Sequence, residues 1–535
     1  MRVLISILFI FITTFSPVDA AIKSIGAGER GAISVSRHEV FDIPFVAKER
    51  SASPFDVELV AIFISPTGAE QRVPAFYNGN NEWVVRFSAG EVGEWSYTTT
   101  SDLRSMSGKK GLLTVGDSIY GGRRGKLVAS KSSVTNFEWE DGSPCFLIAF
   151  GCDFLYALDY HNSDDAPSLN TFVNNIAKEG FNHVIMNVYA YDIVFDLDSK
   201  LSKKQQYIMG GDEKIYPFWG SNAKPNYSML DVNFFRRLDR TIERLNDSNI
   251  VAQLVIYNWD TGVNWAAAGS KEDSLYFDYV VKRYQAFSNV VWSISGSFGD
   301  KVSDEFIIDK CSRLRDLDTF DRLVTVGDDG FCQYYSGAVD FISRRSTSVY
   351  SDREAVKKPT LCIDNGGFEE CGYKLVNGLY VEAEQCLRRS YEVLFGGEYV
   401  TYYWQGAAFS LLFYNVDSLP RGVDRPKMEY YRYLNSFFTR HPYADFKPVS
   451  GLSDSSLCMG DSDGRSYLLY IPKEMSTVSA NGVLSKGQCL LFQWFNTTTG
   501  EYSDVWVGRD VTAKTMPVNP WHLVSDAVLI VKILE

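Results

Sequence analysis

Short apolar runs recur through the middle of the chain, and most of them are followed by a stretch with the periodicity of a helix. Strands that are apolar throughout belong to sheets covered on both faces, and their alternation with helices indicates a parallel sheet. Eight such runs predict a closed (β/α)8 barrel. The predicted strands are residues 145–151, 183–189, 251–257, 290–296, 323–327, 339–343, 359–364 and 399–404.

The segments before and after the barrel have the shorter, alternating pattern of antiparallel strands. Residues 57–64 and 82–87 are runs of this kind separated by turns, which predicts a small sandwich over residues 21–120. The barrel itself is expected at residues 127–445, and a second sandwich at residues 446–535. The predicted fold is therefore multidomain, α/β plus all-β, with a TIM-type (β/α)8 barrel flanked by two β-sandwich domains.

Residues 1–20 have the features of a signal peptide. Arg2 precedes an apolar run at residues 3–15, and small residues lie at the cleavage positions before Ala21. The run is too short for a membrane span, and no later segment is apolar for long enough to form one. The expected location is secreted or periplasmic.

The amino-acid composition argues against a nucleic-acid partner and against a metal site. A formal net charge of −13 argues against a nucleic-acid partner, because phosphate binding needs clustered Lys and Arg. Only 5 His are present, and no HExxH or CxxC motif occurs. The sequence therefore predicts neither a metal site nor any other cofactor.

Acidic residues follow most of the predicted barrel strands, where barrels of this kind carry their chemistry. Cleavage of a glycosidic bond normally uses two carboxyl groups that flank the bond. An acid at the start of a loop can instead cap the following helix. The predicted catalytic candidates are Asp260, Asp328, Asp364 and Glu369.

Aromatic and further polar residues lie at the same strand ends. Sugar rings pack their C–H groups on aromatic faces, although some of these rings must belong to the core. Arg344 and Arg345 suit a carboxylate or sulfate and so indicate an anionic sugar, unless they pair with neighbouring acids. The predicted substrate-binding residues are Asp153, Tyr191, Asp192, Trp259, Arg344 and Trp404.

The domain order and two motifs carry a resemblance to a known group. The barrel opens with Phe137, Asp141-Gly142, Pro144 and Phe146, and the chain ends near the run 525–530, Ser-Asp-Ala-Val-Leu-Ile. The sequence resembles bacterial glycoside hydrolase candidates with a C-terminal collagen-binding-type sandwich, among them the apiosidase-like enzymes. This resemblance implies a carbohydrate substrate and catalytic carboxyl groups after the fourth and seventh strands.

The chain departs from that group at both of the expected catalytic positions. Ser297 stands where the acid after the fourth strand is expected, and Asn365 replaces the central Glu after the seventh. The leading hypothesis is an exported glycoside hydrolase that uses other rim carboxylates. One alternative is a non-catalytic glycan-binding relative. Another is a uronate-specific lyase, with Tyr191 or Tyr335 as base and Arg344 or Arg345 neutralising the substrate carboxylate.

Overall fold

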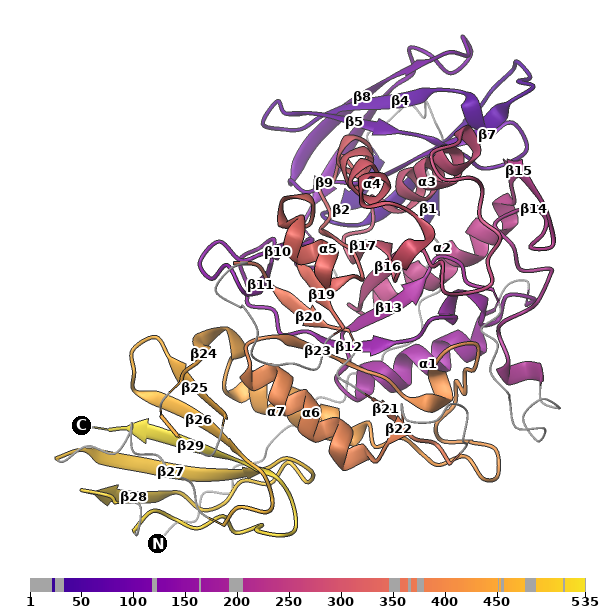
Figure 1. Cartoon of the computed structure of the whole chain (residues 1–535). Helices are drawn as coiled ribbons and strands as arrows, with labels where there is room; N and C mark the ends of the chain where they lie inside the picture. The colour runs from indigo at the N-terminus through magenta and orange to yellow at the C-terminus, as the bar shows by residue number, and fades with distance from the viewer. Residues whose placement is uncertain are drawn as a thin grey trace, which may run out of the picture.

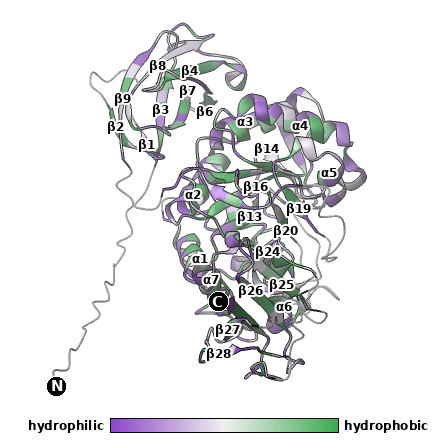
Figure 2. Cartoon of the chain, turned by 90° about the vertical axis from the view of Figure 1, so that its left-hand side faces the viewer, coloured by the Kyte–Doolittle hydropathy of each residue, from purple (hydrophilic) through white to green (hydrophobic). Residues whose placement is uncertain are grey.

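Three groups of sheets follow one another along the chain and occupy successive parts of the molecule (Figure 1). The N-terminal sheets and the C-terminal sheet lie at opposite ends of the barrel domain, and Figure 2 shows the same order from the side. The computed structural model describes residues 22–24, 33–117, 123–162, 165–191, 205–345, 357–363, 367–372, 380–450, 452–453, 457–476, 487–512 and 515–534.

Eight parallel strands form the central sheet and confirm the predicted barrel. Their order in the sheet is β18-β17-β16-β13-β12-β23-β20-β19. The two end strands, β18 and β19, are joined by the hydrogen bond between Thr325 Oγ1 and Ser343 Oγ at 3.1 Å. Just before β19, the Asp340 amide also donates to the Val324 carbonyl at 2.8 Å. The strands are β12 (Ile148–Gly151), β13 (His183–Asn187), β16 (Val251–Tyr257), β17 (Val290–Ser295), β18 (Val324–Thr325), β19 (Ile342–Arg344), β20 (Thr360–Cys362) and β23 (Tyr399–Tyr402).

Helices pack around this sheet and follow the expected sequence signals. The second helix buries an apolar stripe at helical spacing, formed by Phe234, Leu238, Ile242 and Leu245. In Figure 2, α3 and α4 carry both hydrophilic and hydrophobic residues, as expected for helices with one face on the core. The helices are α1 (Pro167–Lys178), α2 (Val232–Asp247), α3 (Lys271–Tyr284), α4 (Asp304–Leu317), α5 (Asp329–Tyr334), α6 (Ala383–Phe395) and α7 (Glu429–Arg440).

The N-terminal part consists of two sheets with a shared apolar core. In that core the rings of Phe63 and Phe87 stack with their centroids 3.8 Å apart. One sheet has the order β1-β3-β7-β6 and the other β2-β9-β8-β4-β5. Their strands are β1 (Lys23–Ser24), β2 (Ile33–Ser36), β3 (Val40–Val46), β4 (Leu59–Ile64), β5 (Glu70–Pro74), β6 (Phe76–Tyr77), β7 (Glu82–Ser88), β8 (Gly93–Ser101) and β9 (Lys110–Gly116).

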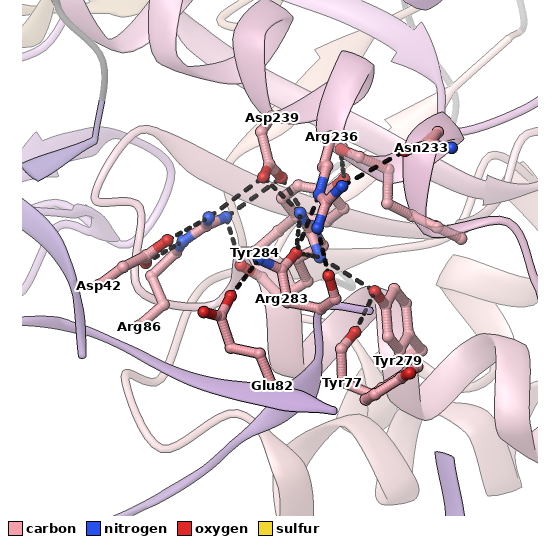
Figure 3. Close-up of polar contacts among 12 residues, drawn as sticks. Asp42, Tyr77, Glu82, Arg86, Asn233, Arg236, Asp239, Tyr279, Arg283 and Tyr284 are labelled. Carbon is pink, nitrogen blue, oxygen red and sulfur yellow. Dashed lines mark hydrogen bonds and ion pairs between the residues drawn. The ribbon is translucent and has the colours of Figure 1, made fainter. Parts of the chain in front are cut away.

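A buried charge network joins the N-terminal sheets to the barrel helices (Figure 3). Arg86 on β7 contacts Asp42 on β3 and Asp239 on α2, at 2.8 Å and 3.1 Å. Arg283 on α3 contacts the same Asp239 at 2.6 Å. Because Asp239 is shared by two guanidinium groups from different parts of the chain, the network fixes the N-terminal sheets against α2 and α3.

The C-terminal part is a six-stranded antiparallel sheet with the order β24-β25-β26-β29-β27-β28. One of its contacts with the barrel is the stacking of Tyr470 on Tyr391 of α6, with centroids 5.3 Å apart. Arg388 of α6 also pairs with Asp526 at 2.8 Å. The strands are β24 (Phe446–Pro448), β25 (Leu457–Asp461), β26 (Ser466–Ile471), β27 (Cys489–Asn496), β28 (Trp506–Arg509) and β29 (Ala527–Ile533).

Three strand pairs lie outside these large sheets. Two of them belong to loops that follow barrel strands, so they shape the face on which the predicted site lies. The pairs are β10 (Leu127–Ala129) with β11 (Phe137–Trp139), β14 (Phe218–Ser221) with β15 (Lys224–Leu230), and β21 (Phe368–Glu369) with β22 (Tyr380–Val381). Within the described residues, no helix is both long enough and apolar enough to cross a membrane.

Candidate active site

A chain of polar contacts crosses the carboxyl ends of the first three barrel strands. The side-chain amide of Asn187 donates to the Asp153 carbonyl at 3.2 Å. The amide of Asn258 in turn donates to Asn187 Oδ1 at 3.3 Å. Asn258 Oδ1 accepts a hydrogen bond from the Asp260 amide at 3.2 Å. Asp153 and Asp260 are therefore linked through two asparagines at one mouth of the barrel.

Arg345 lies at the same mouth of the barrel, beside the ends of strands 4 to 6. This mouth, with the polar contacts that line it, is called the rim below. Its Nε donates to the Gly327 carbonyl at 3.1 Å, and its Nη2 donates to the Gly296 carbonyl at 2.9 Å. Its main-chain amide donates to Asp329 at 2.5 Å. The guanidinium is thereby held over the ends of β17 and β18, with its positive charge near enough to influence Asp153.

Two glycines make this arrangement possible. A Cβ at Gly327 would lie 2.0 Å from the Gly296 carbonyl oxygen, so no larger residue fits there without a shift of the backbone. At Gly296 a Cβ would meet Val255 at 3.3 Å and Asn258 at 3.7 Å. The close approach of these two strand ends places both carbonyls where Arg345 can bind them.

The surroundings of the Asp153 carboxyl group change its protonation. Burial raises its pKa to about 6, although the positive charge of Arg345 and a hydrogen bond from the main chain of Phe409 act in the opposite direction. A carboxyl group with such a pKa is protonated in weakly acidic solution, which suits proton donation.

The loop after β16 carries two of the predicted residues. Asp260 is exposed, and its main-chain amide is fixed by Asn258. Trp259 is partly exposed and stacks on Tyr257 with centroids 4.9 Å apart and an interplanar angle of 17°. The structure therefore gives this loop a supported aromatic ring beside a solvent-accessible carboxylate.

Asp328 has the capping role considered from its sequence position. Its Oδ1 accepts a hydrogen bond of 2.8 Å from the Phe331 amide at the start of α5. It lies after β18 on the same barrel face as Arg345, but part of its carboxylate is engaged by the helix. Its catalytic role stays a prediction.

Glu369 lies on the helix side of the strands. Its carboxylate accepts hydrogen bonds from Tyr402 Oη at 2.9 Å and from the Lys427 amide at 2.6 Å. Tyr402 itself packs on Phe181 and on Tyr431 of α7. Burial raises the pKa of Glu369 to about 7, and these two hydrogen bonds oppose that effect. Its contacts are those of a buried residue that ties a loop to β23 and to the segment before α7, and none within the described residues joins it to Asp153 or Asp260.

Two predicted substrate-binding residues have structural contacts instead. Arg344 is buried and pairs with Glu398 at 2.5 Å, so the neighbouring Arg345 is the arginine at the rim. Trp404 is 0% exposed, which leaves its ring no open face for a sugar. Both residues lie in or beside strands, where alternate side chains point to opposite faces and half of them enter the packed interior.

Of the three remaining predicted residues, the structure describes one, Tyr191. Tyr191 is partly exposed, and its hydroxyl donates to Glu213 at 2.5 Å. Asp192 and Asp364 lie outside the described residues. Among the residues that are described, no three His, Cys, Asp or Glu side chains gather in a group that could hold a metal ion.

The predicted site residues did not include Asn187 or Asn258, and Arg345 was named beside Arg344 only as a residue that suits an anionic sugar group. The signal that could have found the two asparagines was their position, because Asn187 lies near the end of the predicted strand 183–189 and Asn258 directly follows the predicted strand 251–257. An asparagine at a strand end is equally consistent with a turn, so the residue type alone did not indicate a site.

Comparisons with known proteins agree with this architecture. Residues 133–329 match the apiosidase-like catalytic domain family, and residues 34–102 match the DUF5060 domain of unknown function. No curated protein matches the chain significantly.

Two solved structures extend the likeness. A candidate glycoside hydrolase from Bacteroides vulgatus shares 19% identity at a TM-score of 0.73, covering 94% of this chain and 100% of that one. A glycoside hydrolase family 5 structure from the same organism shares 16% identity at a TM-score of 0.54, covering 77% of this chain and 94% of that one. At these identities the likeness establishes the fold. The resemblance predicted from the sequence is confirmed: this chain is similar to apiosidase-like catalytic domains in its barrel and to bacterial glycoside hydrolase structures in its architecture.

Proposed function

We propose that the protein is an exported glycosidase that cleaves its substrate at the carboxyl mouth of the barrel. The observation that carries the proposal is the continuous polar rim from Asp153 through Asn187 and Asn258 to the Asp260 loop. It links the main chains of the two residues that carry these carboxyl groups, at the face where barrels of this kind carry their chemistry. The glycoside hydrolase-like fold supports the same reaction class.

In this proposal the two acids have different roles because their surroundings differ. Asp153, with a pKa raised by burial, gives its proton to the leaving oxygen as the glycosidic C–O bond breaks. Exposed Asp260 acts from the other side, as nucleophile or as the base that activates water. As a nucleophile, Asp260 forms a bond to the sugar that water then breaks, and the proton of that water goes to Asp153. As a base, Asp260 takes the proton of the attacking water and releases it to solvent, from which Asp153 is protonated again.

The rim also favours a substrate that carries negative charge. Arg345 uses Nε and Nη2 for the Gly296 and Gly327 carbonyls, and no hydrogen bond from its Nη1 is formed with the part of the chain that the structure describes. A guanidinium fixed in this way can donate to a uronic carboxylate or a sulfate of the substrate. We therefore propose an acidic saccharide as the substrate class.

The test is hydrolysis of a panel of neutral and acidic oligosaccharides, with products separated by size. We expect wild-type protein to release sugar from an acidic member, and Asp153→Asn and Asp260→Asn each to lower kcat/KM by at least about a hundredfold. Asp463→Asn, in the turn between β25 and β26, is the matched control and should leave the rate unchanged. Full activity in both active-site variants would overturn the assignment of these residues.

The same experiment separates the two alternative functions. Binding of an oligosaccharide with no product after prolonged incubation would identify a glycan-binding relative, which the loss of acids at Ser297 and Asn365 favours. A product with a new ultraviolet-absorbing double bond would identify a uronate lyase instead. Export is proposed from residues 1–20, and N-terminal sequencing of protein recovered from outside the cytoplasm should begin at Ala21.

A further inference from the structure

A hairpin in the loop between β13 and α2 presents an exposed tryptophan beside a pocket. The hairpin, β14 with β15, projects at the edge of the barrel (Figure 1). Trp219 is 56% exposed, whereas its neighbour Phe218 is buried and packs on Tyr216, Tyr227 and Tyr276. Phe218 therefore anchors the hairpin, and the large ring next to it is left open to solvent.

The backbone at this point has a shape that holds the indole outward. The register of the two strands shifts between Phe218 and Trp219. Gly220 has φ +98°, and a Cβ there would lie 2.3 Å from the Lys224 carbonyl oxygen. Only glycine fits this position without a shift, so the irregular strand that directs Trp219 away from the core depends on it.

The pocket next to this ring has a volume of about 220 Å³ and a mixed lining. The aromatic residues Tyr216, Phe218 and Trp219 form one part of it, and the polar side chains of Lys214, Asp231 and Asn233 form another. Aromatic faces that pack on C–H groups, together with separate donors and acceptors for hydroxyl groups, are the combination that recognises a sugar ring.

The hairpin is tied to the loop that carries Trp259 and Asp260. Asn222 lies in the turn of the hairpin. It donates to the Gly262 carbonyl at 2.9 Å and accepts from the Asn264 amide at 2.8 Å. Tyr216 and Tyr227 both donate to the Asn264 carbonyl, at 3.0 Å and 2.9 Å. A ligand on the hairpin would therefore have a fixed position relative to the rim.

We propose that Trp219 and its pocket form an additional saccharide-binding subsite, which holds a sugar unit of a long substrate away from the cleaved bond. The choice of ligand rests on the proposed function, but the subsite can be tested without turnover. Because Trp219 is exposed, its replacement should leave the fold intact, and an unchanged thermal unfolding midpoint checks this.

The test is affinity electrophoresis of full-length protein in gels containing galactomannan, arabinoxylan or polygalacturonate. The Asp153→Asn background prevents degradation of the polymer during the run. We expect at least one polysaccharide to retard the background protein, Trp219→Ala to weaken that binding about tenfold, and Trp219→Phe to restore part of it. Trp506→Ala, at the 38% exposed tryptophan of β28, is the matched control and should bind as the background does.

A second measurement distinguishes failure of the subsite from failure of the proposed function. Hydrolysis of a short aryl glycoside should be unaffected by Trp219→Ala, while KM for the polymer should rise about tenfold. If retardation depends on Trp219 but the wild-type protein hydrolyses none of the substrates, the subsite is supported and the proposed glycosidase activity is contradicted. Equal retardation of Trp219→Ala and the background, or no retardation by any of the three polymers, would overturn the subsite.

Discussion

The guanidinium of Arg86, on a strand of the N-terminal sheets, donates hydrogen bonds of 3.1 Å and 3.2 Å to the carboxylate of Asp239, on a barrel helix (Figure 3). Both side chains are buried, and Arg283 approaches the same carboxylate from a second helix. The N-terminal sheets and the barrel are thereby joined by paired charges in addition to apolar contacts.

Removing Arg86 should destabilise the protein strongly. Arg86→Ala would leave Asp42 and Asp239 without a shared cation, and breaking a buried pair in this way costs about 3–5 kcal/mol. Arg72→Ala is the control, because Arg72 and Glu70 form an exposed pair worth at most about 1 kcal/mol. Urea unfolding of both variants measures the difference. Equal losses would show that the buried network does not hold the two parts together.

The same network should make stability depend on pH in acid. Burial disfavours the ionised form of Asp239, but Arg283 and Arg86 outweigh it and hold the pKa at about 2. Since this pKa is below the unfolded value of about 4, the carboxylate stabilises the fold above pH 4, and the contribution is lost as the pH falls towards 2. Asp239→Asn should be less stable at pH 6 and should lose less stability than wild type on acidification. Parallel stability curves for the two proteins between pH 6 and pH 2 would contradict this.

Activity should fall as the pH rises through about 6 if Asp153 is the proton donor. Burial raises the pKa of Asp153 above its unfolded value, so the carboxyl group is protonated at low pH and ionises as the pH passes about 6. The same shift affects folding: the protonated group stabilises the fold fully below about pH 4, and this stabilisation is lost as the pH rises through about 6. Arg345 lowers this pKa, so Arg345→Gln should move the fall in kcat/KM to higher pH. The pH–rate profile is the measurement.

Glu369 provides the control for that profile, because burial raises its pKa to about 7. In Glu369→Gln, kcat/KM should still fall as the pH rises through about 6. If the fall disappears in Glu369→Gln and persists in Arg345→Gln at its original pH, the titrating group is Glu369 and the role given to Asp153 is wrong.

Gly327→Ala should damage both stability and the rim. The new methyl group would lie 2.0 Å from the Gly296 carbonyl oxygen, so the ends of β17 and β18 must separate, and overpacking of this kind costs about 1–3 kcal/mol. The shift would also move a carbonyl that Arg345 binds. Gly337→Ala is the control, since nothing lies within 4 Å of its added Cβ. Thermal unfolding and kcat/KM together report the effect, and wild-type values for Gly327→Ala would exclude the close contact.

Asn258→Ala should lower activity by loosening the Asp260 loop. The change removes the acceptor for the Asp260 amide and the donor to buried Asn187, and an unsatisfied buried polar group costs about 1–3 kcal/mol. Asn170→Ala, at an exposed position of α1, is the control. Measurement of kcat/KM alongside unfolding free energy separates the two effects. A stability loss with unchanged kcat/KM would show that the rim does not position Asp260.

The sequence by itself determined the architecture. The apolar runs were long enough and regular enough to indicate the parallel strands of the barrel, because a strand buried on both faces must be apolar throughout. The helical spacing of Phe234, Leu238 and Ile242 likewise agrees with the face that is buried. The domain order and motifs supported the resemblance to apiosidase-like proteins, which the family match over residues 133–329 confirms.

Only the tertiary structure decided which side chains meet at the mouth. Arg344 and Arg345 are adjacent in sequence, yet one pairs with buried Glu398 and the other binds the carbonyls at the rim, since neighbouring strand residues point to opposite faces. Asn187 and Asn258 are 71 positions apart, and their contact depends on the register of β13 against β16. Register and side-chain direction arise from packing between distant segments, so the pattern along the chain located the rim but could not choose its members.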